Sequence, residues 1–183
     1  NYWVNNYLLG KTPPAFDILY WNADSTRLPA ALHGDLLDFF KLNPLTHPTG
    51  LNVCGTPVDL TQVDLDSFTV AGSNDHITPW DAVYRSALLL GGNRRFVLSN
   101  SGHIQSIINP PGNPKAYYLD NPRLPSDPRA WFHDAQRSDG SWWPLWLAWI
   151  TPRSGPLKAP RRELGNATYP PLGPAPGTYV LTR

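Results

Sequence analysis

The stretch SFTVAGSNDHITPWDAVYRSALLLGGNRRFVLSNSGH, residues 67–103, decides the fold of this chain. It opens with residues 67–71, a run rich in strand-forming side chains, which a polar turn at 72–76 interrupts. Thr78 followed by Pro79 then predicts the start of a helix. A second strand at 95–98 runs into a polar loop. The stretch therefore predicts a strand, an acid-bearing turn, a helix, a second strand and a histidine-bearing loop.

The predicted helix connects the two strands and fixes how they pair. Val83, Ala87 and Leu90 fall on one helical face, and Gly91 with Gly92 ends the helix. A right-handed crossover of this length allows little besides neighbouring parallel strands. We therefore expect 67–71 and 95–98 to lie side by side and parallel.

Two ionisable residues follow these strands, Asp75 after the first and His103 after the second. The carboxyl ends of strands in open α/β sheets are where functional sites are built. Their side chains are expected within hydrogen-bond reach, about 2.6 to 3.2 Å. The alternative is that Asp75 is a turn residue and His103 a capping or buried polar residue.

The order acid then histidine is that of α/β-hydrolase triads, in which a nucleophile comes first. A carboxylate accepts the proton-bearing ring nitrogen of the histidine and fixes its tautomer, so that the other nitrogen can deprotonate a nucleophile. Asp75 and His103 are therefore candidate catalytic residues.

Several motifs closely resemble those of the polyhydroxyalkanoate synthases. Their sequences are most like those of the class that polymerises medium-chain monomers. The resemblance covers essentially the whole chain. The motifs are GSNDHITPW at 72–80, FVLSNSGHI at 96–104, INPPGNPK at 108–115, NYWVNNYLLG at 1–10, FDILYWN at 16–22 and SWW at 141–143.

The resemblance implies an α/β fold, the C-terminal portion of an α/β-hydrolase. Residues 1–50 would be the late part of the cap subdomain, and residues 51–183 the C-terminal part of the core with a proline-rich tail. In that family a cysteine, an aspartate and a histidine transfer (R)-3-hydroxyacyl groups from coenzyme A thioesters to a growing polyester. Asp75 and His103 match the family's acid and base. The nucleophile's G-x-C-x-G elbow is absent, so the cysteine is expected upstream of this chain.

The resemblance also implies partners and a location: the acyl-coenzyme A substrate, the polyester chain, a homodimer, and the surface of polyester granules in the cytoplasm. Alternatives remain open. A lipase, esterase or polyester depolymerase would use the same acid and histidine with water as the acceptor. A rival of another class is a non-catalytic module that binds granules or a partner through aromatic surfaces.

The composition narrows the possible functions. A chain of 183 residues with 41% hydrophobic content can bury one sizeable core. The net charge of +1 with scattered basic residues predicts no nucleic-acid partner, and no apolar run is long enough for a membrane span. The five histidines lack paired ligand spacing, so we expect no metal, and no cofactor is expected. The chain begins at Asn1 without an initiator methionine, so we expect it to be the C-terminal part of a longer enzyme.

Two further residues compete for catalytic roles. Cys54 is the single cysteine, but Asn52 and Thr56 stand where an elbow would place glycines. We expect a buried structural thiol in a hairpin of 51–54 and 58–60 turned at 55–57. His76 neighbours Asp75, and adjacent residues in a turn usually point apart, so we expect it in the site wall.

The remaining segments are predicted from hydrophobic periodicity and from residues that interrupt helices and strands. A helix is expected over 30–41, with an apolar stripe of the core-packing kind, and a proline-punctuated loop over 112–130. Ser141 is expected to cap a helix whose Trp142, Trp146 and Trp149 act as core or interface anchors. After about Thr151 the chain is expected to be extended, with a last short strand at 177–180.

Overall fold

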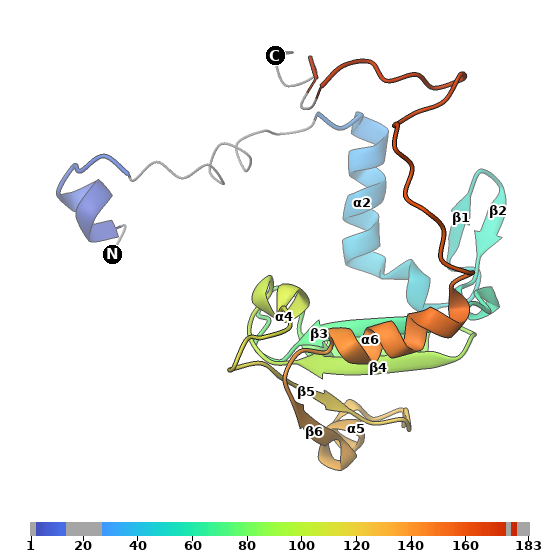
Figure 1. The fold of residues 1–183 in the computed structure, drawn as a ribbon. Coiled ribbons are helices and arrows are strands. Elements are labelled where there is room, and N and C mark those ends of the chain that lie inside the picture. The colour runs from blue at the N-terminus through green and yellow to red at the C-terminus, as the bar shows by residue number, and fades with distance from the viewer. Residues whose placement is uncertain (1–2, 14–26, 175–176, 179–183) are drawn as a thin grey trace. The chain divides into compact units, whose positions relative to one another are not determined.

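The computed structural model describes residues 3–13, 27–174 and 177–178. The chain divides into two compact units. One unit consists of Asn1–Asp66 and Leu89–Asn93, and the other of Ser67–Leu88 and Arg94–Arg183 (Figure 1). Part of the strand expected at 177–180 and the whole FDILYWN motif at 16–22 lie outside the described residues.

A sheet with the strand order β3-β4-β5-β6 forms the centre of the second unit. The first two strands, β3 (Ser67–Gly72) and β4 (Arg94–Ser99), are parallel, and Val70 lies opposite Val97. This confirms the pairing predicted from the sequence. The next two strands, β5 (Tyr117–Asp120) and β6 (Gln136–Asp139), each pair in the antiparallel sense.

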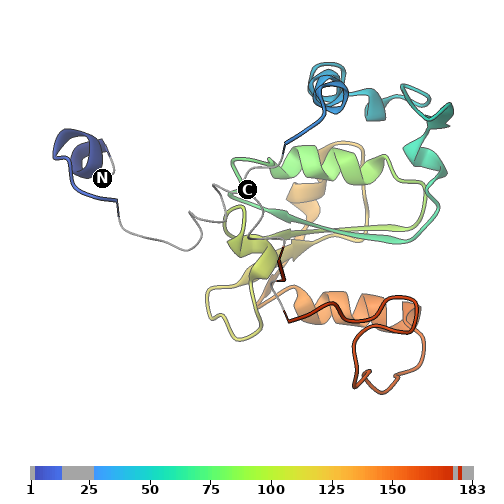
Figure 2. The same cartoon turned by 90° about the horizontal axis from the view of Figure 1, so that it is seen from above.

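Helices cover both faces of this sheet, α3 (Trp80–Leu88) on one face and α6 (Trp143–Ile150) on the other (Figure 2). The alternation of side chains along the strands explains this. Phe68 on β3 packs against α6, with its ring 5.5 Å from that of Trp149. Phe96 on β4 faces the other way and meets Tyr84 of α3 at 5.0 Å.

The core on the α3 face is aromatic. Trp131, from α5 (Pro128–Asp134), is fully buried, and its ring lies 4.9 Å from Phe96 and 5.6 Å from Tyr84. Its indole N–H also donates to the backbone oxygen of Asn121 at 3.3 Å. β3, α3, β4 and α5 therefore contribute to one buried cluster: Ala71, Tyr84, Ala87, Phe96, Leu98 and Trp131.

The stretch 112–130 differs from the sequence-based prediction. It was predicted to be a loop, but it contains β5 and the start of α5. The prolines misled the prediction, because Pro128 occupies the first helical turn, where its missing N–H costs nothing, and Asp127 caps that turn by accepting from the N–H of Arg129. Leu90 also lies beyond the end of α3, so Tyr84 and Ala87 carry its buried face.

The region from 104 to 150 otherwise follows expectation. A single-turn helix, α4 (Gln105–Ile108), precedes the proline pair at 110–111. The hydroxyl of Ser141 accepts from the N–H of Trp143 at 3.1 Å, but the cap position of α6 is occupied by Trp142, one residue after the predicted cap. Trp142 and Trp149 pack on Phe68, while Trp146 stays partly exposed. The short helix η4 (Thr151–Arg153) follows, and residues 154–174 form no helix or strand.

The first unit holds a hairpin and several helices. Its helices are η1 (Trp3–Leu8), α2 (Ala30–Leu42), η2 (Pro44–Thr46) and η3 (Leu60–Gln62). The predicted helix over 30–41 is therefore confirmed, but its apolar stripe is not packed in a core: α2 has no buried residue, and Leu32, Leu36 and Phe40 are exposed. The hairpin pairs β1 (Leu51–Val53) with β2 (Thr56–Val58), so the second strand begins two residues before the predicted position and the predicted turn at 55–57 is wrong. Its turn is Cys54-Gly55, with φ of 49° and 80°, the positive pair typical of a two-residue hairpin loop.

Within the described ranges, no helix has both the length and the apolarity to cross a membrane.

We expect that replacing Trp131 by alanine lowers the free energy of unfolding by about 3–5 kcal/mol, because it empties the centre of the aromatic cluster. Trp146→Ala is the matched control: it removes the same side chain from a partly exposed position of α6 and should cost much less. Denaturant unfolding followed by near-UV circular dichroism measures both, and equal losses would contradict this assignment of the core.

Candidate active site

Two loops at the carboxyl ends of β3 and β4 form the candidate site. Backbone hydrogen bonds continue the strand pairing into the loops. Ser73 N–H donates to the oxygen of Ser99 at 2.9 Å, and Asn74 N–H donates to the oxygen of Ser101 at 3.1 Å. The backbone just before the acid is thus held against the backbone just before the histidine, before any side chain contributes.

The carboxylate of Asp75 accepts four hydrogen bonds. Oδ1 accepts from the backbone N–H groups of Ile77 and Thr78, both at 2.9 Å. Oδ2 accepts from the Thr78 hydroxyl at 2.7 Å and lies 2.8 Å from Nδ1 of His103. The side chain is only 5% exposed, so these groups replace water around the carboxylate. Asp75 is therefore fixed in position.

The surroundings of Asp75 shift its pKa in opposing directions. Burial removes water from the charged form and by itself raises the pKa. The backbone and side-chain hydrogen bonds from Thr78, the bond from His103 and the backbone bond from Ile77 stabilise the carboxylate and together outweigh burial. The net result is a pKa well below the usual value, and Asp75 is ionised at neutral pH.

His103 meets this carboxylate through Nδ1, as the sequence predicted. An ionised carboxylate can only accept a hydrogen bond, so Nδ1 carries the proton. In the neutral ring the other nitrogen, Nε2, then holds the free lone pair and points away from Asp75. The imidazole is 43% exposed and thus open on one side. This arrangement is that of a histidine held ready to act as a general base.

The other histidine–aspartate contacts differ from this pair. His76 follows Asp75 in the chain, yet it is exposed, and the carboxylate bonds His103 instead. His133 lies 2.8 Å from Asp134, its neighbour on α5, with both side chains largely exposed. That pair is a local surface contact and lacks the loop framework around Asp75 and His103.

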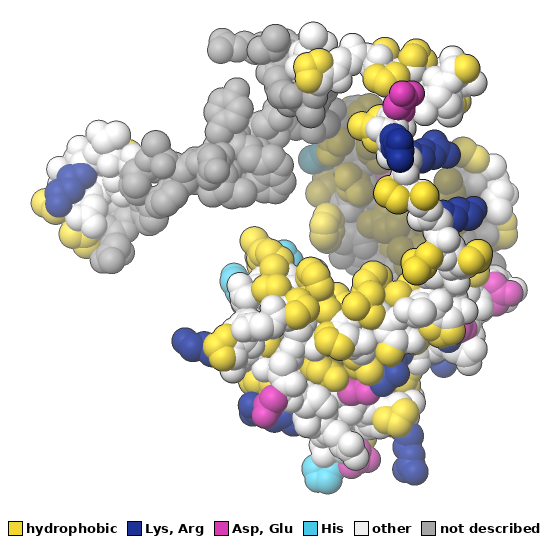
Figure 3. Space-filling model, viewed as in Figure 1, with side chains coloured by type: hydrophobic (Ala, Val, Ile, Leu, Met, Phe, Trp, Pro, Cys, Tyr) yellow, Lys and Arg dark blue, Asp and Glu magenta, His cyan; other side chains and the backbone are white. Residues whose placement is uncertain are grey.

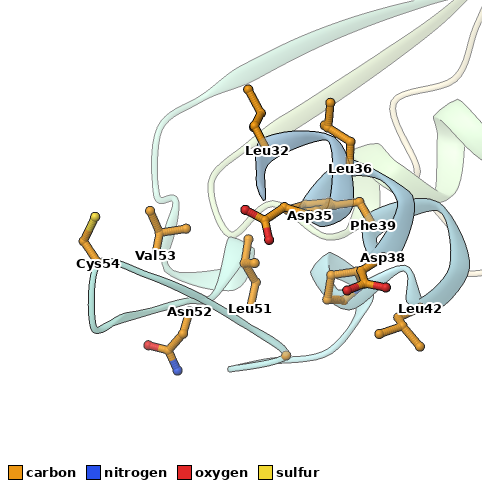
Figure 4. Close-up of a pocket in the computed structure, with 12 residues that line it drawn as sticks. Leu32, Asp35, Leu36, Asp38, Phe39, Leu42, Leu51, Asn52, Val53 and Cys54 are labelled. Carbon is orange, nitrogen blue, oxygen red and sulfur yellow. The ribbon is translucent and has the colours of Figure 1, made fainter. Parts of the chain in front are cut away.

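Cys54 is exposed, so the expectation of a buried thiol is wrong. The residue lies at the tip of the β1–β2 hairpin, where neighbours cannot surround its side chain. It borders a pocket of about 570 Å³ between α2 and the hairpin, within the first unit (Figure 4). A strand follows Cys54, whereas a nucleophile elbow requires a helix at that point.

A cavity of about 290 Å³ lies beside the acid loop in the second unit. Ser73 and Asn74 form its polar side, and Trp80, Leu98, Tyr117, Leu119 and Phe132 form the rest. The residues that immediately precede Asp75 therefore face a partly apolar space.

The sequence analysis missed two groups around the dyad. Thr78 donates to Asp75, although the sequence indicated a helix cap; the spacing of three residues from acid to threonine is a signal for such a local bond. Asn109 is fully buried below the histidine loop, and nothing local in the sequence marks its contacts. Among the described residues, no cluster of three or more His, Cys, Asp or Glu is arranged to hold a metal.

The α/β hydrolase fold family model matches residues 1–110, and the chain belongs to that family. Over all 183 residues it is 91% identical to poly(3-hydroxyalkanoate) polymerase 2 of Ectopseudomonas oleovorans and 60% identical to polymerase 1 of the same organism. It is 45% identical over 184 aligned residues to the polymerase subunit PhaC of Cupriavidus necator. The chain spans about a third of the length of these relatives. These identities confirm the resemblance to the polyhydroxyalkanoate synthases.

The lowered pKa of Asp75 predicts a pH-dependent contribution to stability. The pKa of this carboxyl is lower in the folded protein than its unfolded value of 3.8, so its ionisation stabilises the folded state at pH values above 3.8. This stabilisation is lost as the pH falls through the folded pKa. Asp75→Asn should therefore be less stable than the native protein near about pH 6, and the difference should shrink toward about pH 3.

Denaturant unfolding at a series of pH values measures this difference. Asp134→Asn is the matched control, because its exposed pairing with His133 contributes little to stability at any pH. A stability difference for Asp75→Asn that stays constant as the pH falls would contradict the assignment.

Proposed function

We propose that this chain is the acid- and histidine-bearing C-terminal part of a poly(3-hydroxyalkanoate) polymerase. The observation that carries the proposal is the hydrogen bond between Asp75 and His103 at the ends of two parallel strands, in a chain 91% identical to a protein of that name. The substrate class is (R)-3-hydroxyacyl-coenzyme A, with medium-chain monomers preferred.

In the proposed reaction, Nε2 of His103 removes the proton of a cysteine thiol outside this chain. The thiolate attacks the thioester carbonyl, the bond to the coenzyme A sulfur breaks, and His103 returns the proton to that sulfur. The 3-hydroxyl of another acyl group then gives its proton to the histidine and attacks the carbonyl of the acyl-enzyme. The bond to the cysteine sulfur breaks, His103 returns the proton to that sulfur, and the polyester is extended by one ester bond. Asp75 holds the ring in the required tautomer and helps to activate the hydroxyl.

Several features support a larger assembly around the dyad. Apolar side chains gather over α4 and α6 (Figure 3). They include Ile104, the residue after His103, which is 68% exposed, and Ile107 and Ile108 on the next turn. Patches of this kind normally become covered. The outer edge of β3 also lacks a partner strand among the described residues. Both features fit a site completed by other parts of the polymerase.

The remaining parts of the proposed function are inferred from the resemblance to the family. Residues 1–50 would form the late part of a cap that shields the acyl intermediate from water, and residues 51–183 the core portion. The polymerase would act as a homodimer at the surface of polyester granules in the cytoplasm. A hydrolase with the same dyad is the alternative, and it differs in using water as the acceptor.

Substitution of His103 by alanine in the full-length polymerase should lower the rate of coenzyme A release by about 10²–10⁴-fold, because the general base is lost. His133→Ala is the matched control, since it removes a histidine that also contacts an aspartate but lies at an exposed position of α5. Release of free thiol measures both. Wild-type turnover in a folded His103→Ala enzyme would rule out the proposed role.

The product of the same reaction separates the polymerase from a hydrolase. With (R)-3-hydroxyacyl-coenzyme A as the only substrate, a polymerase yields insoluble polyester that contains most of the acyl groups. A hydrolase yields free hydroxy acid. Gas chromatography of the two fractions decides between them.

Cys54→Ala in the full-length enzyme should retain most of the polymerising activity, because the residue sits on an exposed hairpin tip with no helix after it. The measurement is trapping of the acyl-enzyme with radiolabelled substrate. Complete loss of the trapped species in a folded Cys54→Ala protein would make Cys54 the nucleophile.

A further inference from the structure

The loop that carries His103 is closed on itself by a buried amide. It leaves β4 at Ser99, passes His103 and α4, and ends at Asn109, which is fully buried, as is Ser99. The Asn109 side-chain nitrogen donates to the hydroxyl of Ser99 at 3.0 Å and to Oδ1 of Asn100 at 2.9 Å. One side chain therefore joins the two ends of the histidine loop.

Backbone groups fix which way this amide points. Asn113 Oδ1 accepts from the N–H of Lys115, so its Nδ2 faces Asn109 and donates to Oδ1 there at 2.9 Å. Asn100 Oδ1 accepts from the N–H of Tyr117, which leaves it as an acceptor for Asn109. The nitrogen of Asn109 must then face the start of the loop. Both of its hydrogens and its oxygen are used.

The loop needs such an anchor because its backbone is strained. Ser101, two positions before His103, has φ of 84°, a region that residues other than glycine rarely adopt. A strained residue persists only where its surroundings hold it. Among the described residues, the His103 ring itself has one hydrogen-bond partner, Asp75, so the position of the ring depends on its backbone.

We propose that Asn109 is a positioning residue for His103. Its amide holds the two ends of the loop together and thereby keeps the imidazole against Asp75 with Nε2 free. This role rests on the proposed function, in which His103 is the catalytic base. Asn109 itself touches neither the dyad nor the substrate in this account; it acts through the backbone of residues 99–109.

The test uses the full-length polymerase with Asn109→Ala. A displacement of the base by about an ångström reduces the rate about 100-fold, so kcat for coenzyme A release should fall by this factor with KM nearly unchanged. Asn121→Ala is the matched control. Asn121 is also buried and also bonds backbone groups, Trp131 O and Arg123 N, but it supports the α5 side of the sheet. Asn121→Ala should lower the melting temperature about as much as Asn109→Ala does, but it should change kcat by less than about threefold.

A double substitution separates positioning from general loss of stability. Asp75→Asn already disturbs the orientation of the ring, so adding Asn109→Ala should reduce its residual turnover by less than about threefold, far below the single effect. Ser99→Ala and Asn113→Ala provide milder variants if Asn109→Ala folds poorly, and both should lower kcat in the same sense. Losses that multiply in the double variant, or equal kcat losses for Asn109 and Asn121, overturn the inference.

His103→Ala assayed in parallel separates the catalytic role of His103 from the positioning role of Asn109. Full turnover in His103→Ala overturns the proposed function and the role of Asn109 with it. Loss of turnover in His103→Ala, together with unchanged kcat in Asn109→Ala, overturns the role of Asn109 alone.

Discussion

The parallel pairing of β3 with β4 is the constraint on which the rest of the second unit depends. Parallel strands end at the same edge of a sheet, so the loops that follow them start side by side. Here the hydrogen bonds from Ser73 to Ser99 and from Asn74 to Ser101 extend that pairing past the strand ends. The contact between Asp75 and His103 is a consequence of this backbone register as much as of the attraction between the two side chains.

The aromatic core explains why this register is stable. Register in a sheet is set by which side chains must be buried, because a slip of one residue turns every side chain to the other face. Phe68 is matched to Trp149 of α6 and Phe96 to Tyr84 and Trp131. Such a slip would place both phenylalanines on the wrong layer. The packing at a distance from the dyad therefore determines the geometry of the dyad.

The dyad has a rigid side and an open side. The side chain of Asp75 is almost fully shielded and accepts four hydrogen bonds, whereas the imidazole of His103 is half-exposed and, within the described part of the chain, bonded through Nδ1 alone. A fixed acid and a histidine whose ring is exposed on the side of Nε2 suit a base that serves two successive acyl transfers in the proposed polymerase. The exposed isoleucines beside it fit a site that is covered by further parts of a longer protein.

The sequence by itself determined the elements that depend on local signals: the two strands, the helix between them, their parallel pairing, α2, the start of α6 and the proximity of Asp75 and His103. Each rests on periodicity, a capping residue or a topological rule that acts over a few tens of residues. The tertiary structure alone decided the strand and helix within 112–134, because the burial of Trp131 against β4 outweighs the prolines that suggested a loop. It also decided the exposure of Cys54 and the closure of the histidine loop by Asn109. Burial and side-chain contacts of this kind arise only when distant segments pack together, and no local pattern encodes them.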